Sequence, residues 1–172
     1  MLILYKGGKR SLIIGNKETF AVEFILCDNY SSLLEGTFSY WINSEKVGDD
    51  SEPVYLNDVL MSMIWMNHDS GNRMYPEKIT DDWNEIFCKI NESIYGSDTF
   101  DSCPARYDIS VDIPTGIGHY KVFYIEDDQY GYLMFKRKSD SAVNEFTVKK
   151  GVVDSVLSQT YSELNKLYES VH

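Results

Sequence analysis

The sequence has few of the residues that build metal centres, cofactor sites and nucleophilic active sites. It contains three cysteines and three histidines in 172 residues. Cys27, Cys88 and Cys103 are widely spaced, and no pair has the spacing of zinc ligands. No separation between a cysteine and a histidine matches a local signature of a thiol nucleophile. We therefore expect no metal and no cofactor, and a reduced, cytoplasmic protein with buried or idle thiols.

Long apolar runs are also missing. No stretch approaches the roughly 20 apolar residues of a membrane-spanning helix. The opening MLILYKGGKR has an apolar run of about four residues, which is too short for the core of a secretory signal. Neither a membrane partner nor an exported form is expected.

Positive charge is scarce, because 16 Lys and Arg stand against 27 Asp and Glu, for a net charge of −11. The imbalance is strongest in residues 21–60, which carry eight acidic residues and one lysine. Nucleic acid is not an expected partner, since phosphate binding needs Lys and Arg to displace counterions. An acidic surface can attract a basic protein and speed the encounter, or it can simply keep the chain soluble.

What the sequence does contain is a globular composition, with 43% hydrophobic and 14% aromatic residues, in a length that suits one domain. Alternation of apolar and polar residues predicts several strands, and the second strand of the first clear hairpin places Trp41 on the face away from Phe38. The cleanest alternation lies at residues 107–113. Strands are predicted over residues 2–5, 12–14, 20–27, 37–43, 107–113, 120–125, 130–138 and 144–149.

Three segments show the periodicity of helices. The first spans residues 56–69, the second follows the capping run Thr80-Asp81-Asp82 and ends at Gly96, and the third spans 151–170. Short turns between consecutive strands imply antiparallel pairing. The predicted fold class is α+β, a mainly antiparallel sheet of about five or six strands with three helices packed mostly on one face.

Carboxylates are the richest set of polar side chains, and they gather in an acidic loop and at the tip of a predicted hairpin. A pair of them could catalyse hydrolysis only if one were partly buried with a raised pKa. Carboxylates in loops and at hairpin tips are usually solvated. An exposed tryptophan among them would be a natural anchor for a basic protein. The candidate contact residues are Trp41, Asp49, Asp50, Glu52, Glu126, Asp127 and Asp128.

Short aromatic and glycine-centred motifs lie between residues 13 and 73. They are Ile14-Gly15-Asn16, Phe20 to Phe24, Gly36 to Asn43, Val47-Gly48-Asp49, Leu56 with Asp58 to Leu60, and Asp69 to Arg73. In these motifs the sequence resembles the immunity proteins of bacterial polymorphic toxin systems, in particular immunity protein family forty-two. Residues 1–12 look like an added N-terminal segment. Tyr55 stands where such proteins tend to have Ser or Thr before the helix, a departure at the N-cap.

The resemblance implies a single immunity-type domain over residues 1–172 that has no enzymatic activity and no catalytic residues. It would act in the bacterial cytoplasm by binding a cognate toxin and blocking its active site. The acidic surface suits a basic toxin, such as a nuclease, and the candidate contact residues above would bind it. The alternatives are a small hydrolase using a carboxylate pair and a non-catalytic oligomerising module. The protein is expected to be a monomer or a homodimer.

Overall fold

The computed structural model describes residues 2–6, 9–27, 34–49, 51–96 and 101–171. These residues form nine strands, three α-helices and two short 3-10 helices. The strands are β1 (Leu2–Lys6), β2 (Lys9–Gly15), β3 (Phe20–Leu26), β4 (Glu35–Ile42), β5 (Glu45–Val47), β6 (Val54–Tyr55), β7 (Tyr120–Glu126), β8 (Tyr130–Arg137) and β9 (Asn144–Lys149). The helices are α1 (Leu56–His68), α2 (Trp83–Tyr95), η1 (Pro104–Tyr107), η2 (Gly116–His119) and α3 (Val152–Val171).

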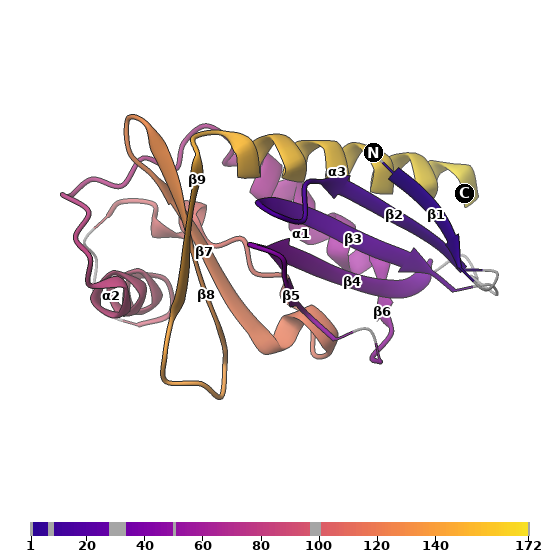
Figure 1. The fold of residues 1–172 in the computed structure, drawn as a ribbon, viewed down its shortest axis with the longest axis horizontal. Helices are drawn as coiled ribbons and strands as arrows, with labels where there is room; N and C mark the ends of the chain where they lie inside the picture. Colours follow the sequence, from indigo (N-terminus) through magenta and orange to yellow (C-terminus); the bar gives the residue numbers. More distant parts are fainter. Residues whose placement is uncertain (1, 7–8, 28–33, 50, 97–100, 172) are drawn as a thin grey trace.

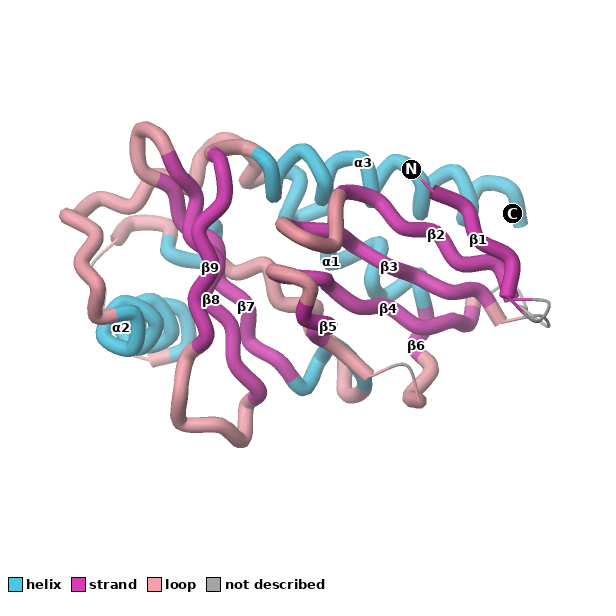
Figure 2. Tube along the Cα trace, in the orientation of Figure 1, coloured by secondary structure: helices cyan, strands magenta, loops and turns pink. Residues whose placement is uncertain are grey.

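The strands form two separate antiparallel sheets (Figures 1 and 2). In sheet A the order is β1-β2-β3-β4-β5, and β6 also pairs with β4. In sheet B the order is β7-β8-β9. The α+β class is therefore confirmed, while the single sheet expected from the sequence is replaced by two.

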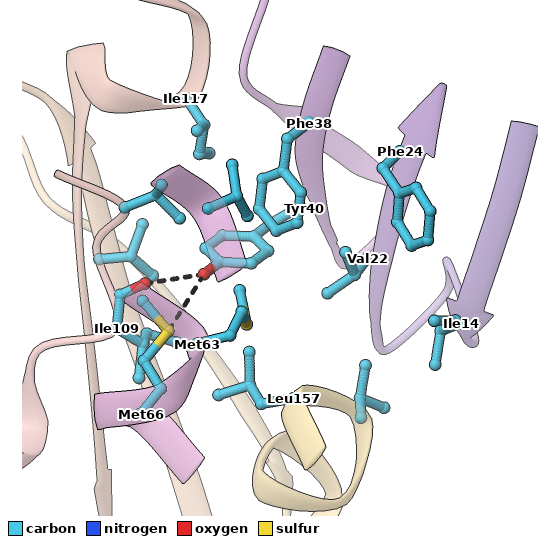
Figure 3. Close-up of a cluster of buried hydrophobic side chains, with 14 of the residues drawn as sticks. Ile14, Val22, Phe24, Phe38, Tyr40, Met63, Met66, Ile109, Ile117 and Leu157 are labelled. Atoms are coloured by element: carbon cyan, nitrogen blue, oxygen red, sulfur yellow. Dashed lines mark hydrogen bonds between the residues drawn. The ribbon is translucent and has the colours of Figure 1, made fainter. Parts of the chain in front are cut away.

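Helices α1 and α3 pack side by side across one face of sheet A (Figure 1). The alternation in β3 and β4 causes this, because every second side chain is large and apolar and points to the same face. At the centre lies Tyr40, whose ring contacts the rings of Phe20 and Phe38 and whose hydroxyl donates to the carbonyl of Ile109 at 2.8 Å (Figure 3).

Sheet B is covered on both faces. One face joins the core shared with α1, α3 and sheet A through residues such as Val122 and Leu133. Phe123 and Met134 point to the opposite face, where they pack with α2 and η1 in a second core. This explains why β7 and β8 are apolar on both faces. Helix α2 therefore lies beyond sheet B and does not share the face that α1 and α3 cover (Figure 1).

The prediction of a strand at residues 107–113 is wrong. Its alternation is real, since Tyr107, Ile109, Val111 and Ile113 are all buried. Yet the chain forms only an isolated bridge between Asp108 and Phe123. Next to this bridge, side chains form hydrogen bonds that a regular strand would form with backbone groups. The Asp108 carboxylate accepts the Ser110 N–H at 2.7 Å, and the Ser110 hydroxyl accepts the Val122 N–H at 2.9 Å.

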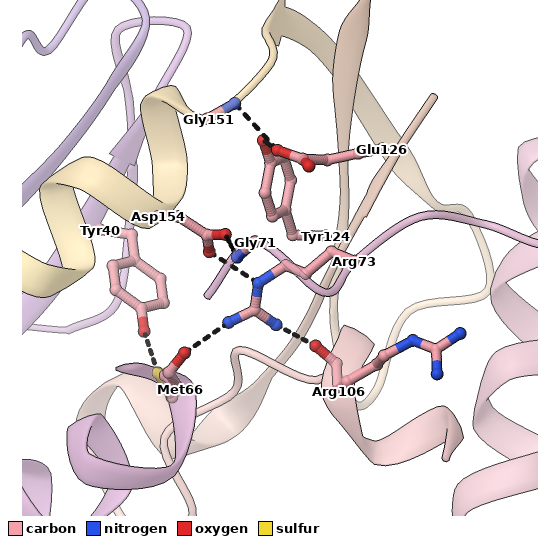
Figure 4. A network of polar contacts seen from close by, with 9 residues as sticks. All are labelled: Tyr40, Met66, Gly71, Arg73, Arg106, Tyr124, Glu126, Gly151 and Asp154. Carbon is pink, nitrogen blue, oxygen red and sulfur yellow. Dashed lines mark hydrogen bonds and ion pairs between the residues drawn. The ribbon is translucent and has the colours of Figure 1, made fainter. Parts of the chain in front are cut away.

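A buried arginine connects the helices that cover sheet A to η1, which packs against sheet B. Arg73 is 0% exposed; its Nε donates to the Asp154 carboxylate at 2.7 Å and its Nη2 to the Met66 carbonyl at 2.8 Å (Figure 4). Its Nη1 donates to the carbonyl of Arg106. The other Asp154 oxygen accepts the Gly71 N–H at 2.7 Å. One guanidinium thus fixes the end of α1, the start of α3 and η1 relative to one another.

Candidate functional site

The acidic loop connects β5 to β6 along the edge of sheet A. It begins at Gly48, where φ is +130° and an added Cβ would lie 3.0 Å from that of Ser39. The Asp49 carboxylate accepts the Ser51 N–H at 2.8 Å, and its hydrogen bonds with Ser51 hold its pKa below the usual value. Asp50 lies outside the described residues. Asp49 is therefore held in its charged form at the surface.

Glu52 ties this loop to η2. Its carboxylate accepts the Gly116 N–H at 2.7 Å and lies 3.0 Å from Nε2 of His119. The backbone hydrogen bond from Gly116, followed by the one with His119, lowers the pKa of Glu52. Glu52 is thus ionised, and its position is fixed by contacts with Gly116 and His119, which follow it by 64 and 67 residues in the sequence.

Beside the loop is a groove of about 430 Å³ between β6, the start of α1 and the turn before η2. Its walls are formed by Glu35, Pro53, Val54, Tyr55, Asp58, Ile113, Pro114 and Thr115. Thr115 donates to the carbonyl of Pro53, which directly follows Glu52, so the groove and the acidic loop are continuous.

The carboxylates around this groove are mostly unneutralised. Within the described part of the chain, Glu35, Asp49 and Asp58 have no salt bridge, and only Glu52 is paired, with His119. Apolar walls with a carboxylate rim suit the side chain of a lysine or arginine, whose stem is apolar and whose end is charged. We name Glu35, Asp49, Glu52 and Asp58 the acidic rim.

Two carboxyl groups of the acidic rim, those of Asp49 and Glu52, have a lowered pKa. Wherever a carboxyl pKa departs clearly from its usual value among the described residues, it is lowered, as for Glu23, Asp49, Glu52, Asp101 and Asp127. The hydrolase alternative needs the opposite shift in one carboxyl group. The same residues contain no group of three His, Cys, Asp or Glu side chains arranged to hold a metal.

Trp41 lies on the face of sheet A opposite α1 and α3, as its alternation with Phe38 predicts. It is half-buried, and its indole N–H donates to Glu23 at 2.7 Å. The Lys17 ammonium lies 3.7 Å from the ring centroid. Burial favours a raised pKa for Glu23, but the Trp41 hydrogen bond together with Lys46 and Lys17 outweighs it and lowers that pKa. Trp41 is therefore engaged within the protein, and its role in binding a partner stays a prediction.

The hairpin tip differs from the solvated cluster that the sequence suggests. Glu126 is only 2% exposed and accepts the Tyr124 hydroxyl at 2.6 Å and the Gly151 N–H at 2.9 Å (Figure 4). Expecting a solvated side chain there is wrong, because the start of α3 covers it. Asp127 accepts two N–H groups of its own turn and the Tyr132 hydroxyl, while Asp128 is exposed.

The two acidic clusters are not brought together. Glu52 contacts the residues just before β7, whereas the tip follows the end of that strand. Seven residues of strand span about 20 Å. The structure instead places Glu35 and Asp58 in the groove that is also lined by Pro53, the residue after Glu52. The sequence does not predict these two residues as part of the site. They come from β4 and α1, and no local pattern indicates that both lie near the turn at residues 113–115 in the folded chain.

The family model described as Immunity protein 42 matches residues 12–163. The chain belongs to this family. The match reaches well past the motifs at residues 13–73 and includes α2, sheet B, most of sheet A and most of α3, while β1 lies outside it. Membership supports an immunity function that neutralises a toxin, and Arg73 at the end of the last motif is the buried arginine described above.

A solved structure shares the fold of this family member. The crystal structure of CdiI from Burkholderia dolosa AUO158 superposes with a TM-score of 0.68 and 16% sequence identity, covering 88% of this chain and 99% of that chain. At this identity the similarity concerns the fold. No curated protein matches the sequence significantly. Among the described helices, none combines the length and apolar character needed to cross a bilayer.

Proposed function

We propose that this immunity protein neutralises a toxin domain without enzymatic activity, by placing the acidic rim over a basic substrate groove of the toxin. The observation that carries the proposal is the groove of about 430 Å³, whose walls include Glu35 and Asp58 and which is bordered by the loop that holds Asp49 and Glu52. Among the described residues, only Glu52 of these four carboxylates forms a salt bridge. Such a surface gains most from a partner that supplies lysines and arginines.

A nuclease is the toxin class that this charge favours. An enzyme that binds a phosphate backbone needs lysines and arginines in its substrate groove. An acidic protein that fills the groove removes access to the substrate and is attracted by the same field. We place this activity in the bacterial cytoplasm, with residues 1–172 acting as one unit, because Arg73 joins α1 and α3, which cover sheet A, to η1, which packs against sheet B.

Reversal of charge on the rim tests the proposal. We expect the toxin to be encoded directly upstream. The double variant Glu35→Lys with Asp58→Lys should slow association with that toxin domain by about tenfold or more, and coexpression should protect cells less. The double variant Asp81→Lys with Glu145→Lys is the control, because it changes net charge equally at exposed sites outside the groove and outside the predicted contact residues.

Stopped-flow association rates and survival of coexpressing cells are the two measurements. Equal rates for the groove and control variants would remove the acidic rim from the interface. A wild-type chain that neither binds nor protects against the upstream toxin would refute the proposed function itself.

A further inference from the structure

Helix α1 is apolar on two faces. Leu56, Val59, Leu60, Met63 and Met66 are buried against sheet A and α3. On the outward face, Met61 is 58% exposed, Ile64 is 39% exposed and Trp65 is 70% exposed. Residues three and four apart lie together on a helix surface, so these three form one patch, which we name the outer face of α1.

The outer face has no cover within the described part of the chain. A surface helix normally shows charged and polar residues opposite its buried stripe. Here that position is occupied by Trp65, which has the highest exposed fraction of any large apolar side chain among the residues whose burial is described. Contiguous exposed apolar side chains mark interaction sites, and tryptophan is enriched among the residues that dominate binding energy.

The charges around the patch indicate what covers it. Asp58 lies three residues before Met61, and Asp69 lies four residues after Trp65. Neither carboxylate has a salt bridge among the described residues. A twofold contact between two copies would bring the same acidic residues together and repel. A partner with lysines and arginines around an apolar pocket is complementary in both respects.

The outer face also lies next to the groove, because Asp58 lines the groove and lies three residues, about one helical turn, before Met61. We propose that Met61, Ile64 and Trp65 are the apolar anchor that seats the toxin domain, while the acidic rim covers its basic groove. This inference rests on the proposed function and adds a second requirement for the toxin. The toxin must present an apolar pocket bordered by basic residues next to its substrate groove.

Substitution of Trp65 tests the anchor. In calorimetry with the upstream toxin domain, Trp65→Ala should weaken binding by about 30-fold or more, which is the loss that defines a dominant interface residue. Dissociation should become faster, whereas the association rate and its salt dependence should stay unchanged. The matched control is Tyr130→Ala, since Tyr130 is 48% exposed and lies at the start of β8, away from α1.

Each outcome separates the two proposals. Tight wild-type binding with equal affinities for Trp65→Ala and Tyr130→Ala overturns the anchor and leaves the proposed function standing. A wild-type chain that does not bind the toxin overturns the proposed function and the anchor with it. Light scattering that shows a dimer, converted to a monomer by Trp65→Ala, assigns the outer face to a second copy and also overturns the anchor.

Discussion

At the scale of single residues, Arg73 is a fully buried charge whose removal should cost much stability. Its charge lies entirely out of water and is compensated by the Asp154 carboxylate and two carbonyls. A buried ion pair adds little net stability compared with apolar residues of the same volume, but removal of one partner leaves the other charged and desolvated. Arg73 is therefore a residue whose loss is costly even though its presence is not strongly stabilising.

Arg73→Met should lower the free energy of unfolding by about 3–5 kcal/mol, because Asp154 then remains buried without a cation. Urea denaturation at neutral pH measures this. Lys166→Met is the control, since Lys166 is exposed and its ion pair with Glu163 lies at the surface, where such pairs contribute about 0–1 kcal/mol. Equal losses for the two variants would contradict a compensating role for the Arg73–Asp154 pair.

Residue environments are the part of the structure that the sequence predicts least. The face of Trp41 follows from alternation within β4, and it is confirmed. The burial of Glu126 depends on Gly151 at the start of α3, and that of Arg73 depends on Asp154. No local pattern contains such distant partners. Trp65 is different, because Met61, Ile64 and Trp65 fall outside the core stripe of α1, and this spacing is visible in the sequence.

At the scale of elements, local chemistry predicts most of what forms. The hairpins β3–β4 and β7–β8, strand β9 and all three helices occur where alternation or periodicity places them, and β1 and β2 contain the predicted short apolar runs. The failures have physical causes. Residues 107–113 have the burial pattern of a strand but share only one backbone hydrogen bond with β7, from the Ile109 N–H to the Val122 carbonyl, among those found in the described residues. Side chains make the neighbouring hydrogen bonds. Strands β5 and β6 have three and two residues, too few to show a period.

The N-termini of α1 and α2 show how a cap works and what replaces it. Asp82 caps α2, because its carboxylate accepts the Glu85 N–H at 3.0 Å. Tyr55 gives α1 no side-chain cap, which is the departure visible in the sequence. Instead, the Leu56 N–H donates to the Leu34 carbonyl at 3.0 Å. The start of α1 is therefore satisfied by tertiary structure.

Asp82→Ala should destabilise the protein by about 1 kcal/mol, because the Glu85 N–H loses its acceptor at the start of α2. Thermal or urea unfolding measures the change. Asp81→Ala removes the adjacent exposed carboxylate, for which no hydrogen bond to the helix is found among the described residues, and it should change stability by less than about 0.5 kcal/mol. A larger loss of stability for Asp81→Ala than for Asp82→Ala would show that Asp82 is not the residue that caps α2.

At the scale of the whole molecule, the division into two sheets could not be predicted from the sequence. Short turns predict antiparallel neighbours but do not say which hairpins join the same sheet. Here sheet B turns one face toward Tyr40 and the core of sheet A, and the other toward α2. The groove arises from the same arrangement, since its walls come from β4, β6, α1 and the turn at residues 113–115.

Net charge is the molecular property that should govern how fast the toxin is captured. With a charge of −11, association with a basic toxin should fall by about tenfold or more between low and high salt, because ions screen the attraction before contact. Stopped-flow mixing across a salt series measures this, and the dissociation rate should change much less. An association rate that does not vary with salt would show that the acidic surface does not steer the encounter.

The Arg73–Asp154 pair can form only late in the synthesis of the chain, because its two residues lie far apart in the sequence. Asp154 follows Arg73 by 81 positions, and α3, which covers sheet A, begins just before it. Translation at about 5–20 residues per second therefore leaves the guanidinium without its carboxylate for on the order of ten seconds. Neutralisation of a toxin thus depends on finished chains, since a nascent chain still lacks the helix that closes its core.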